Sequence, residues 1–282
     1  MDVRTSRNVV GHHISRVKLG KRSHANESLA AEEPLEIRLI WQDNGETVRK
    51  NIAVTMRTPG DDFELAAGFL HGEGIVNARH DIADISHCTD EDEEQAFNIV
   101  NVTLDPRITF DVSRLDRNFY MSSSCGICGK ATLDAIEVQG CEPLRAGFTV
   151  DSDVICGLPE SLRAAQVVFE STGGLHAAGS FDANGALSVL REDVGRHNAL
   201  DKLIGRQFLD GKTPLVEGVL MLSGRASFEL LQKALVARIP VVAAIGAPSS
   251  LAVQLAESFN ITLLGFVRPD GFNIYSGAAR VT

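Results

Sequence analysis

Residues 218–267 read GVLMLSGRASFELLQKALVARIPVVAAIGAPSSLAVQLAESFNITLLGFV, and this stretch decides the fold. Three short apolar runs, at 218–222, 241–245 and 261–267, do not alternate with polar residues, which is typical of strands buried on both faces. The two segments between them, 226–238 and 249–259, have the apolar spacing of helices. Strands connected by helices in this order predict a sheet that helices cover on both faces.

The flanking segments extend the same architecture over residues 150–282. The sequence predicts a helix at 158–171, a hairpin of strands at 175–182 and 186–191 that turns at Asn184-Gly185, a helix at 196–209 and a last strand at 272–275. We therefore expect the α/β class, with a mixed sheet and helices on both of its faces.

A smaller β-rich region precedes this domain. Alternating apolar and polar residues on both sides of Asp43-Asn44-Gly45 predict a hairpin. The elements expected in this region are strands at 35–42 and 47–55, a helix from Asp61 or Asp62 to Gly72 or Gly74, and strands at 82–88 and 96–104. The first residues are polar and aperiodic, which favours a disordered or loosely attached arm.

These patterns divide the chain into four regions. We expect a flexible N-terminal arm at 1–33, the smaller β-rich region with one helix at 34–124, a CxxC loop and linker at 125–149, and the α/β domain at 150–282.

Composition and charge exclude several classes of protein. The 282 residues are 44% hydrophobic, and their longest apolar run is interrupted by Arg238 and Pro240, so we expect no membrane-spanning segment. A net charge of -10 argues against a broad nucleic-acid surface. The basic N-terminus lacks the apolar core of a secretion signal, and five cysteines are an odd number. We therefore expect a cytoplasmic protein with reduced thiols.

Two of the cysteines form a CxxC pair, Cys125 and Cys128, just before an expected helix start. Free N–H groups and the helix dipole stabilise a thiolate there, which lowers the pKa of a thiol and makes it a nucleophile. Half of a zinc site and a thioredoxin-like redox pair are the alternatives. A zinc site lacks a second pair of ligands, because Cys141 and Cys156 are single and irregularly spaced. A redox pair should follow the first strand of a small βαβ domain, but this pair comes after a long loop.

The order of elements after residue 150 resembles the cytidine deaminase-like fold. Deaminases of that fold need H-x-E and P-C-x-x-C at two consecutive helix starts to hold zinc. Here the first start is Gly195-Arg196-His197-Asn198, without the glutamate, and the second is SGRAS at 223–227, without a cysteine. We therefore expect the fold without its zinc site. His197 is either a core histidine or, beside Arg196 at a helix start, part of an anion site.

Five stretches together resemble the formate dehydrogenase accessory sulfurtransferase family (FdhD). They are SCGICG at 124–129, GLHAA at 174–178, EDVGRHNALDK at 192–202, SGRAS at 223–227 and GFVR at 265–268. The resemblance runs from about residue 33 to the C-terminus, and it implies a zinc-free cytidine deaminase-like domain preceded by a smaller β-rich region.

The resemblance also implies a role in sulfur delivery. A cysteine desulfurase would pass a persulfide to the CxxC loop, with Cys125 as the carrier and Cys128 assisting or relaying. The sulfur would then reach the molybdenum bis(molybdopterin guanine dinucleotide) cofactor before this cargo enters the catalytic subunit of formate dehydrogenase. Such transfer resembles disulfide exchange, so it suits a low-pKa thiol. We also expect a homodimer.

Binding of the cofactor is expected at a second set of residues. The resemblance assigns it to the stretch formed by Phe266, Val267, Arg268, Pro269, Asp270 and Gly271, and it makes GDP a fragment ligand. His197 and Arg225 are proposed only from their positions at helix starts. A chaperone that binds the cofactor without moving sulfur, or a CxxC redox protein, remains an alternative function.

Overall fold

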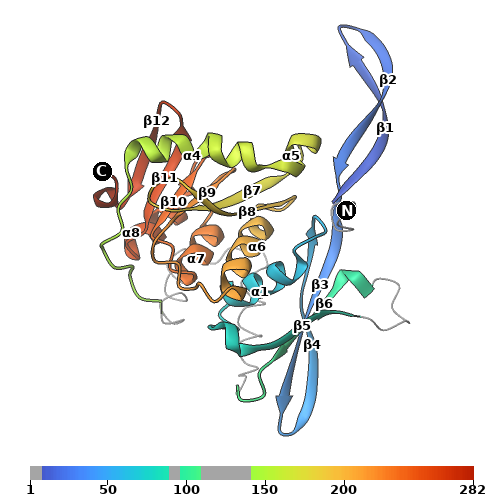
Figure 1. Cartoon of the computed structure of the whole chain (residues 1–282), viewed down its shortest axis with the longest axis vertical. Coiled ribbons are helices and arrows are strands. Elements are labelled where there is room, and N and C mark those ends of the chain that lie inside the picture. The colour runs from blue at the N-terminus through green and yellow to red at the C-terminus, as the bar shows by residue number, and fades with distance from the viewer. Residues whose placement is uncertain (1–7, 89–95, 109–140) are drawn as a thin grey trace.

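The computed structural model describes residues 8–88, 96–108 and 141–282. Within them the chain forms a two-stranded ribbon, a four-stranded sheet and a six-stranded sheet. Figure 1 shows the six-stranded sheet with its helices as one layered body, the four-stranded sheet beside it, and the ribbon projecting away from both. Short 3₁₀ turns are formed by Arg79–Asp81, Ala96–Asn98 and Ala278–Arg280.

The four-stranded sheet begins with the predicted hairpin, which is confirmed. Strands β3 (Glu33–Asp43) and β4 (Glu46–Arg57) pair across Asn44 and Gly45, both of which have positive φ, as a two-residue hairpin turn requires. Every second side chain of β3 is buried, and helix α1 (Asp62–Gly72) contributes Leu65, Ala66 and Leu70 to the same apolar core.

The predicted strands after α1 are also present. They are β5 (Ile82–His87) and β6 (Ile99–Leu104), and the order of strands in the sheet is β4-β3-β6-β5. Strands β3 and β6 run parallel, whereas the other neighbours are antiparallel.

The six-stranded sheet confirms the expected mixed architecture. Its strand order is β12-β11-β10-β9-β7-β8, with β9, β10 and β11 parallel and the remaining neighbours antiparallel. The strands are β7 (His176–Phe181), β8 (Leu187–Asp193), β9 (Val219–Leu222), β10 (Val241–Ala244), β11 (Thr262–Arg268) and β12 (Gly271–Ser276). All residues of β9 and β10 are buried, because helices lie on both faces.

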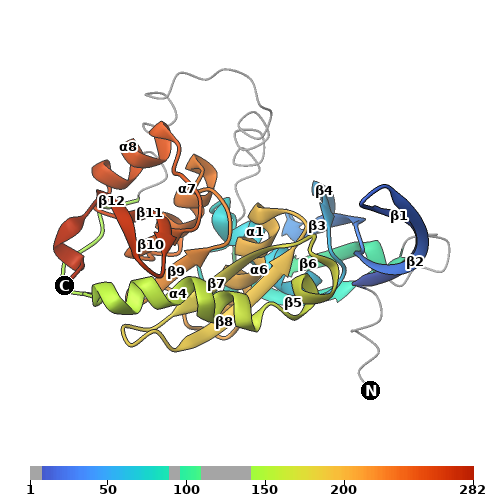
Figure 2. The same cartoon turned by 90° about the horizontal axis from the view of Figure 1, so that it is seen from above.

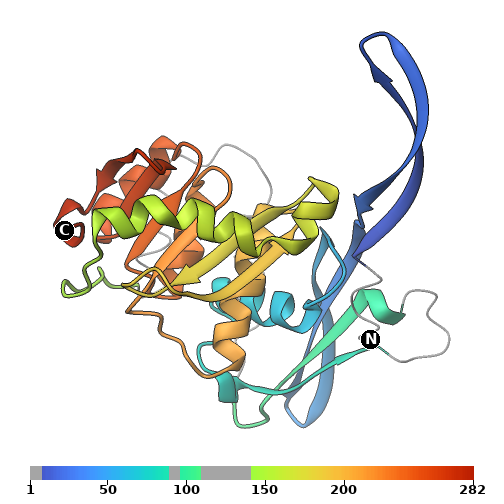
Figure 3. The same cartoon turned by 45° about the horizontal axis from the view of Figure 1, so that its top comes forward.

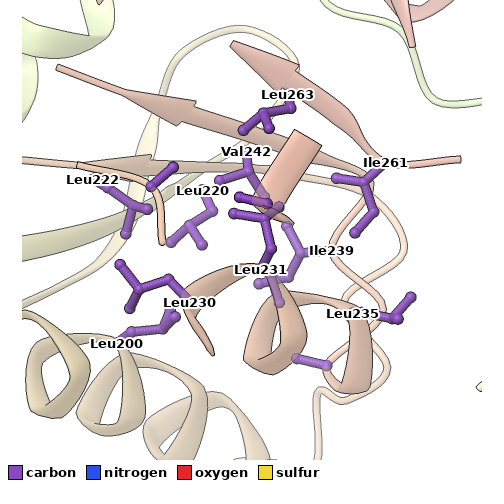
Figure 4. Close-up of a cluster of buried hydrophobic side chains, with 14 of the residues drawn as sticks. Leu200, Leu220, Leu222, Leu230, Leu231, Leu235, Ile239, Val242, Ile261 and Leu263 are labelled. Carbon is purple, nitrogen blue, oxygen red and sulfur yellow. The ribbon is translucent and has the colours of Figure 1, made fainter. Parts of the chain in front are cut away.

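Successive side chains of these strands enter two different cores. Leu220, Leu222 and Val242 point toward α6 (Arg196–Leu209) and α7 (Phe228–Val236), as Figure 4 shows, and α8 (Ser250–Ser258) adds to this core. Their neighbours Val219 and Met221 pack instead with helix α4 (Ser152–Ala165) on the opposite face. Figure 2 shows α4 on its own side of the sheet.

The helix expected at 158–171 is corrected to two helices, α4 and α5 (Val167–Thr172). Helix α4 begins earlier because the carboxylate of Asp151 accepts a hydrogen bond from the N–H of Asp153, at 2.7 Å, and caps it. It ends at Gln166, where the backbone leaves the helical region. The carboxylate of Glu192 then accepts hydrogen bonds from the backbone N–H groups of Val168 and Phe169, at the start of α5.

Of the two forms expected for the arm at 1–33, the disordered one is wrong for most of its length. Strands β1 (Val9–Lys18) and β2 (Lys21–Ala30) pair over ten residues each around a turn at Leu19-Gly20. Both turn residues have positive φ, as such a hairpin needs. None of the paired side chains is buried, so the sequence carries no alternation that would reveal the strands. We call this hairpin the arm (Figures 1 and 3).

Helix α6 joins the two larger sheets. Its Leu200 and Leu203 pack under the six-stranded sheet, whereas Phe208, near its C-terminal end, is fully buried in the core of the four-stranded sheet. Helices α1 and α6 lie side by side in all three views, and this contact holds the small sheet against the α/β layers (Figure 3).

Candidate functional site

Three loops meet at the carboxyl edge of strands β9, β10 and β11. Because these strands are parallel, their C-terminal ends lie at one edge, which is where α/β sheets bind ligands. The N–H of Gly246 after β10 donates to the carbonyl of Gly224 after β9, at 2.8 Å. The N–H of Phe266 in β11 donates to the carbonyl of Gly246, at 3.2 Å. The three loops therefore form one continuous surface.

Glycines let these loops approach each other closely. A Cβ on Gly246 would lie 2.9 Å from the carbonyl oxygen of Gly224 and 3.0 Å from the Cα of Arg225. A Cβ on Gly265 would lie 2.9 Å from a ring carbon of Tyr275. Distances under 3.0 Å are shorter than side chains tolerate, so the surface depends on glycine at these positions.

The expected cofactor stretch lies at this edge. Phe266 is 45% exposed although its φ is +53°, a conformation that is rare and strained for a bulky residue. The register of β11 against β12 shifts between Gly265 and Arg268, and this irregularity directs the ring of Phe266 outward. An exposed aromatic ring on a strained backbone is a feature of binding sites rather than of packing.

The remaining residues of the stretch differ in what they offer a ligand. Arg268, Pro269 and Asp270 are exposed at the turn between β11 and β12, whereas the side chain of Val267 is fully buried in the core under α4. Any contact from Val267 must therefore come from its backbone. Arg268 donates through Nη1 to the carbonyls of Ile245 and Val267, each at 2.8 Å. Its Nε and Nη2 make no hydrogen bond within the described part of the chain.

His197 and Arg225 lie beside the same loops. His197 is in the first turn of α6, and its Nε2 is 3.4 Å from the hydroxyl of Ser227 and 3.7 Å from Oε2 of Glu229 at the start of α7. Arg225 is exposed in the loop that leads into α7, with its stem against Gly246. The starts of α6 and α7 therefore adjoin at the carboxyl edge.

His176 was not singled out from the sequence, although it belongs to the same cluster. It begins β7, which runs antiparallel to β9, so it lies next to the loop after β9. Its Nδ1 is 3.3 Å from where a Cβ on Gly224 would stand. Only the stretch GLHAA, which was part of the family resemblance, pointed to this residue.

The two histidines are held neutral at neutral pH. Burial lowers the pKa of His176 and of His197, and the nearby guanidinium of Arg196 lowers both further. The Nε of Arg196 is buried and has no hydrogen-bond partner among the described residues. The guanidinium of Arg196, two neutral imidazoles and the carboxylate of Glu229 thus lie near the N-terminal end of α6, whose free N–H groups favour anions.

Asp193 explains much of the EDVGRHNALDK stretch in structural terms. Its carboxylate is fully buried and accepts hydrogen bonds from the backbone N–H groups of Thr58, at 3.1 Å, and Gly195, at 2.8 Å. It also accepts one from the side chain of Asn198, at 3.1 Å, and forms a 2.7 Å ion pair with Lys202. Lys202 in turn donates to the carbonyl of Thr58, at 2.8 Å. Asp193 therefore fixes the start of α6 against the small sheet.

Cys125 and Cys128 lie outside the described residues. Among the residues that follow them, the carbonyl of Glu142 accepts a hydrogen bond from Arg238, at 2.6 Å, and the N–H of Leu144 donates to the carbonyl of Phe259, at 2.9 Å. Burial raises the pKa of Cys141 and of Cys156, so these thiols are weaker nucleophiles than a free cysteine.

Neither a group of metal ligands nor a membrane-spanning helix is present in the described part of the chain. In the part of the chain that the structure describes, no three His, Cys, Asp or Glu side chains are grouped so that they could hold a metal ion. Among the described helices, none combines the length and apolar character needed to cross a bilayer.

The fold and this site define a mixed α/β protein with an attached small sheet, in which cationic and aromatic groups gather at the carboxyl edge of parallel strands. The chain belongs to the FdhD/NarQ family, whose model matches residues 30–282. This result confirms the family resemblance found in the sequence.

Similar proteins cover nearly the whole chain. It is 48% identical over 272 residues to the sulfur carrier protein FdhD of Streptomyces coelicolor, with 95% of this chain and 94% of that protein covered. Identity is 49% over 280 residues to the protein of the same name from Mycolicibacterium paratuberculosis, with 98% of each chain covered. Identity is 42% over 268 residues to the sulfur carrier protein FdhD of Sulfolobus acidocaldarius, with 95% of this chain and 96% of that protein covered.

A solved structure has the same fold. The crystal structure of a protein described as a formate dehydrogenase accessory protein, from Desulfotalea psychrophila, aligns with a TM-score of 0.74 at 25% identity. The alignment covers 98% of this chain and all of that one.

Proposed function

We propose that this protein is a sulfur carrier needed for formate dehydrogenase activity. It would take persulfide sulfur from a cysteine desulfurase and pass it to the molybdenum bis(molybdopterin guanine dinucleotide) cofactor before insertion. Membership of the FdhD/NarQ family and the names of its relatives support the general role. The CxxC pair supports the chemistry, because such transfer requires an accessible thiolate.

The transfer of sulfur from the donor to Cys125 has the same chemistry as thiol–disulfide exchange. The thiolate of Cys125 attacks the outer sulfur of the donor's persulfide, the sulfur–sulfur bond of the donor breaks, and the donor cysteine leaves as a thiolate. Cys125 is then the persulfide, without net oxidation or reduction. Cys128 assists this step or relays the sulfur onward.

The nucleotide end of the cofactor is proposed to bind at the carboxyl edge of the large sheet. The observation that carries this proposal is Phe266, exposed on a strained backbone where three glycine-dependent loops join. Its ring offers a stacking surface to a guanine base. The Nε and Nη2 of Arg268 offer charge-assisted hydrogen bonds to a phosphate, and Pro269, Asp270 and Gly271 complete the turn. GDP is the expected fragment ligand.

A second anionic part of the cofactor is proposed to lie near the start of α6. Arg225 and Arg196 supply positive charge there, while His197 and His176 supply neutral imidazoles that donate or accept a hydrogen bond. The network around Asp193 supports this proposal, because it fixes the backbone that carries Arg196 and His197.

We further propose that the α/β domain is a cytidine deaminase-like fold that has lost its zinc. The deaminase ligands are missing from both helix starts, as the sequence shows. Elemental analysis of the purified protein checks this point, and one zinc ion per chain would contradict it. The proposed setting is the cytoplasm, away from membranes and nucleic acid, with the desulfurase and the catalytic subunit of formate dehydrogenase as partners.

Mass spectrometry of the intact protein, after incubation with a cysteine desulfurase and cysteine, tests sulfur transfer directly. We expect an added sulfur on the wild type and on Cys156→Ala, but not on Cys125→Ala. Cells carrying only Cys125→Ala should lack formate dehydrogenase activity, although the variant should still bind GDP. Full activity in those cells would favour transfer through Cys128 alone or a chaperone that binds the cofactor without moving sulfur.

A further inference from the structure

A cavity lies at the edge of the large sheet opposite to the candidate site, where β9 and β10 begin. It has a volume of about 300 Å³ and is formed by the sheet, the C-terminal end of α6 and the loop that follows this helix. Pockets for small molecules start at about this volume, so the cavity can hold one small ligand. We call it the amino-edge cavity, and its polar residues include Ser180, Asp182, Gln207, Lys212 and Glu217.

Gln207 of α6 brings an unpaired hydrogen-bond acceptor to this cavity. The residue is 5% exposed, and its Oε1 has no hydrogen-bond partner among the described residues. Ser180 pairs with Leu220 in the register of β7 and β9, so its hydroxyl lies on the face of the sheet that α6 covers. A buried acceptor without a donor is destabilising, and a ligand that donates a hydrogen bond would relieve this cost.

Two carboxylates at the cavity are acceptors as well. Glu217 is exposed and forms no ion pair within the described part of the chain. Asp182 follows β7, and its Oδ1 accepts hydrogen bonds from the backbone N–H groups of Asn184 and Ala186, at 2.8 and 2.9 Å. These bonds hold the carboxylate of Asp182 in place at the turn, and its negative charge remains.

Positive charge near the cavity is already paired. Among the described residues that line it, only Lys212 is cationic, and its Nζ lies 3.5 Å from Oδ2 of Asp210. Arg206 shares this carboxylate, at 3.1 Å from its Nε. The carboxylates of Asp182, Asp210 and Glu217 therefore outnumber the two cations. The C-terminal end of α6 carries the negative end of the helix dipole and favours a cation further.

The rest of the lining includes apolar side chains. Val216 is 53% exposed at the cavity, although it is a large aliphatic residue. Leu215 and Ile239 line the same space and pack against the core beneath α6 and α7. A ligand with a hydrocarbon part would cover Val216 and remove apolar surface from water.

We propose that the amino-edge cavity binds a small aliphatic amine in its ammonium form. The ammonium group donates a hydrogen bond to Oε1 of Gln207, and the carboxylates of Asp182 and Glu217 attract its charge. Its hydrocarbon chain lies against Leu215 and Val216. The size of the cavity favours a free amine over a lysine side chain of another protein, which would bring a polypeptide backbone with it.

NMR titration of the full chain with n-butylammonium tests the proposal. We expect a dissociation constant on the order of 1 mM, which is within reach of so small a ligand. The n-butyltrimethylammonium ion has the same charge without N–H groups, and n-butanol has a donor without the charge, so each should bind at least about tenfold more weakly. Lysine with both its backbone ends blocked should also bind more weakly than n-butylammonium.

Gln207→Met should weaken the binding of n-butylammonium by at least about tenfold, because it removes the acceptor. The variant keeps a side chain of similar length and loses an unpaired buried group, so its stability should not fall. Glu217→Gln should weaken binding about threefold, since this carboxylate is exposed.

The same two substitutions on α8 are matched controls. Gln254 and Glu257 are exposed and lie outside the cavity lining. Gln254→Met and Glu257→Gln should therefore leave the dissociation constant within a factor of about two of the wild type. Thermal unfolding of all four variants, followed by circular dichroism, checks that each is folded.

Four outcomes would overturn the proposal. They are no spectral change at n-butylammonium concentrations tenfold above the expected dissociation constant, equal affinity for n-butylammonium and n-butyltrimethylammonium, unchanged affinity in Gln207→Met, and tighter binding of the blocked lysine. None of these readings involves GDP binding or the persulfide mass, so failure here leaves the proposed sulfur transfer intact.

Discussion

Gly68 of α1 and Gly205 of α6 face each other where the two helices cross, and neither position has room for a side chain. A Cβ on Gly68 would stand 2.8 Å from the backbone nitrogen of Gly205, and a Cβ on Gly205 would stand 2.7 Å from that of Gly68. Both would also overlap a backbone carbonyl of the other helix, that of Asp201 or Glu64. The small sheet is therefore held against the α/β layers by direct contact between helix backbones.

Gly205→Ala should destabilise the protein by about 3 kcal/mol, at the upper end of overpacking effects, because the clash is with backbone that cannot turn away. Urea unfolding followed by circular dichroism measures the change. Gly157→Ala in α4 is the matched control, since a Cβ there meets nothing within 4 Å. The control should gain about 0.5–1 kcal/mol from the helix preference for alanine. Equal free energies of unfolding for the two variants would contradict this expectation, because α1 and α6 would then move apart to make room for the Cβ without loss of stability.

Asp193→Asn should cost about 3–5 kcal/mol, because it leaves the buried ammonium group of Lys202 without its counter-charge. Replacing both partners, as in Asp193→Asn/Lys202→Met, should recover part of the loss, since no charge then remains buried. The free energies of unfolding of the wild type, both single variants and the double variant form a cycle that measures the coupling. Additive losses would mean that the two residues act separately.

Arg268→Ala should weaken GDP binding by about tenfold or more, because a lost charge-assisted hydrogen bond typically costs about 1.5–3 kcal/mol. Isothermal titration of the purified protein with GDP gives the dissociation constant. Arg79→Ala is the control, because Arg79 also donates to a backbone carbonyl, that of Ile82, but lies in the small sheet region. If Arg268→Ala and Arg79→Ala bind GDP equally well, the phosphate site lies elsewhere.

The buried pair of Asp201 and Lys233 should make stability depend on pH. Burial raises the pKa of Asp201 to about 6, despite the 2.8 Å contact with the ammonium group of Lys233. The folded protein therefore holds this proton more tightly than the unfolded chain, in which the pKa is about 3.9. The resulting stabilisation is complete below about pH 4 and is lost as the pH rises through about 6.

Comparison with Asp201→Asn isolates this contribution. Between about pH 3 and 7 the wild type should lose about 3 kcal/mol relative to the variant, which has no proton to release at this position. Urea midpoints measured across that range provide the test. Parallel profiles for the two proteins would mean that Asp201 keeps the same pKa after unfolding.

Local signals were enough to find most elements of the fold. Asn44-Gly45 indicated its hairpin because only a few residue types adopt the positive φ of such a turn. The apolar runs of β9, β10 and β11 indicated buried strands, and α6 was predicted at 196–209, which are its bounds in the structure. The sequence also indicated residues 266–271, His197 and Arg225 as binding residues, from the family resemblance and from helix starts, and this role stays a prediction.

Elements without a local signal needed the tertiary structure. The arm has no buried face, so its strands left no alternation of polarity, and only their backbone pairing defines them. The early start of α4 depends on one capping carboxylate, Asp151, which resembled any other polar loop residue. Cys125 and Cys128 were recognised from the sequence alone, and their role stays a prediction.

The sequence by itself determined the family and, from β3 onward, the order of strands and helices apart from the division into α4 and α5, because each depends on short spacings along the chain. Only the tertiary structure decided that Asp193 contacts Thr58 and that His176 lies beside Gly224. These partners are far apart in sequence, and they meet because parallel strands end at one edge and α6 spans both sheets. Buried charge and close backbone contact depend on that packing, which local spacing does not encode.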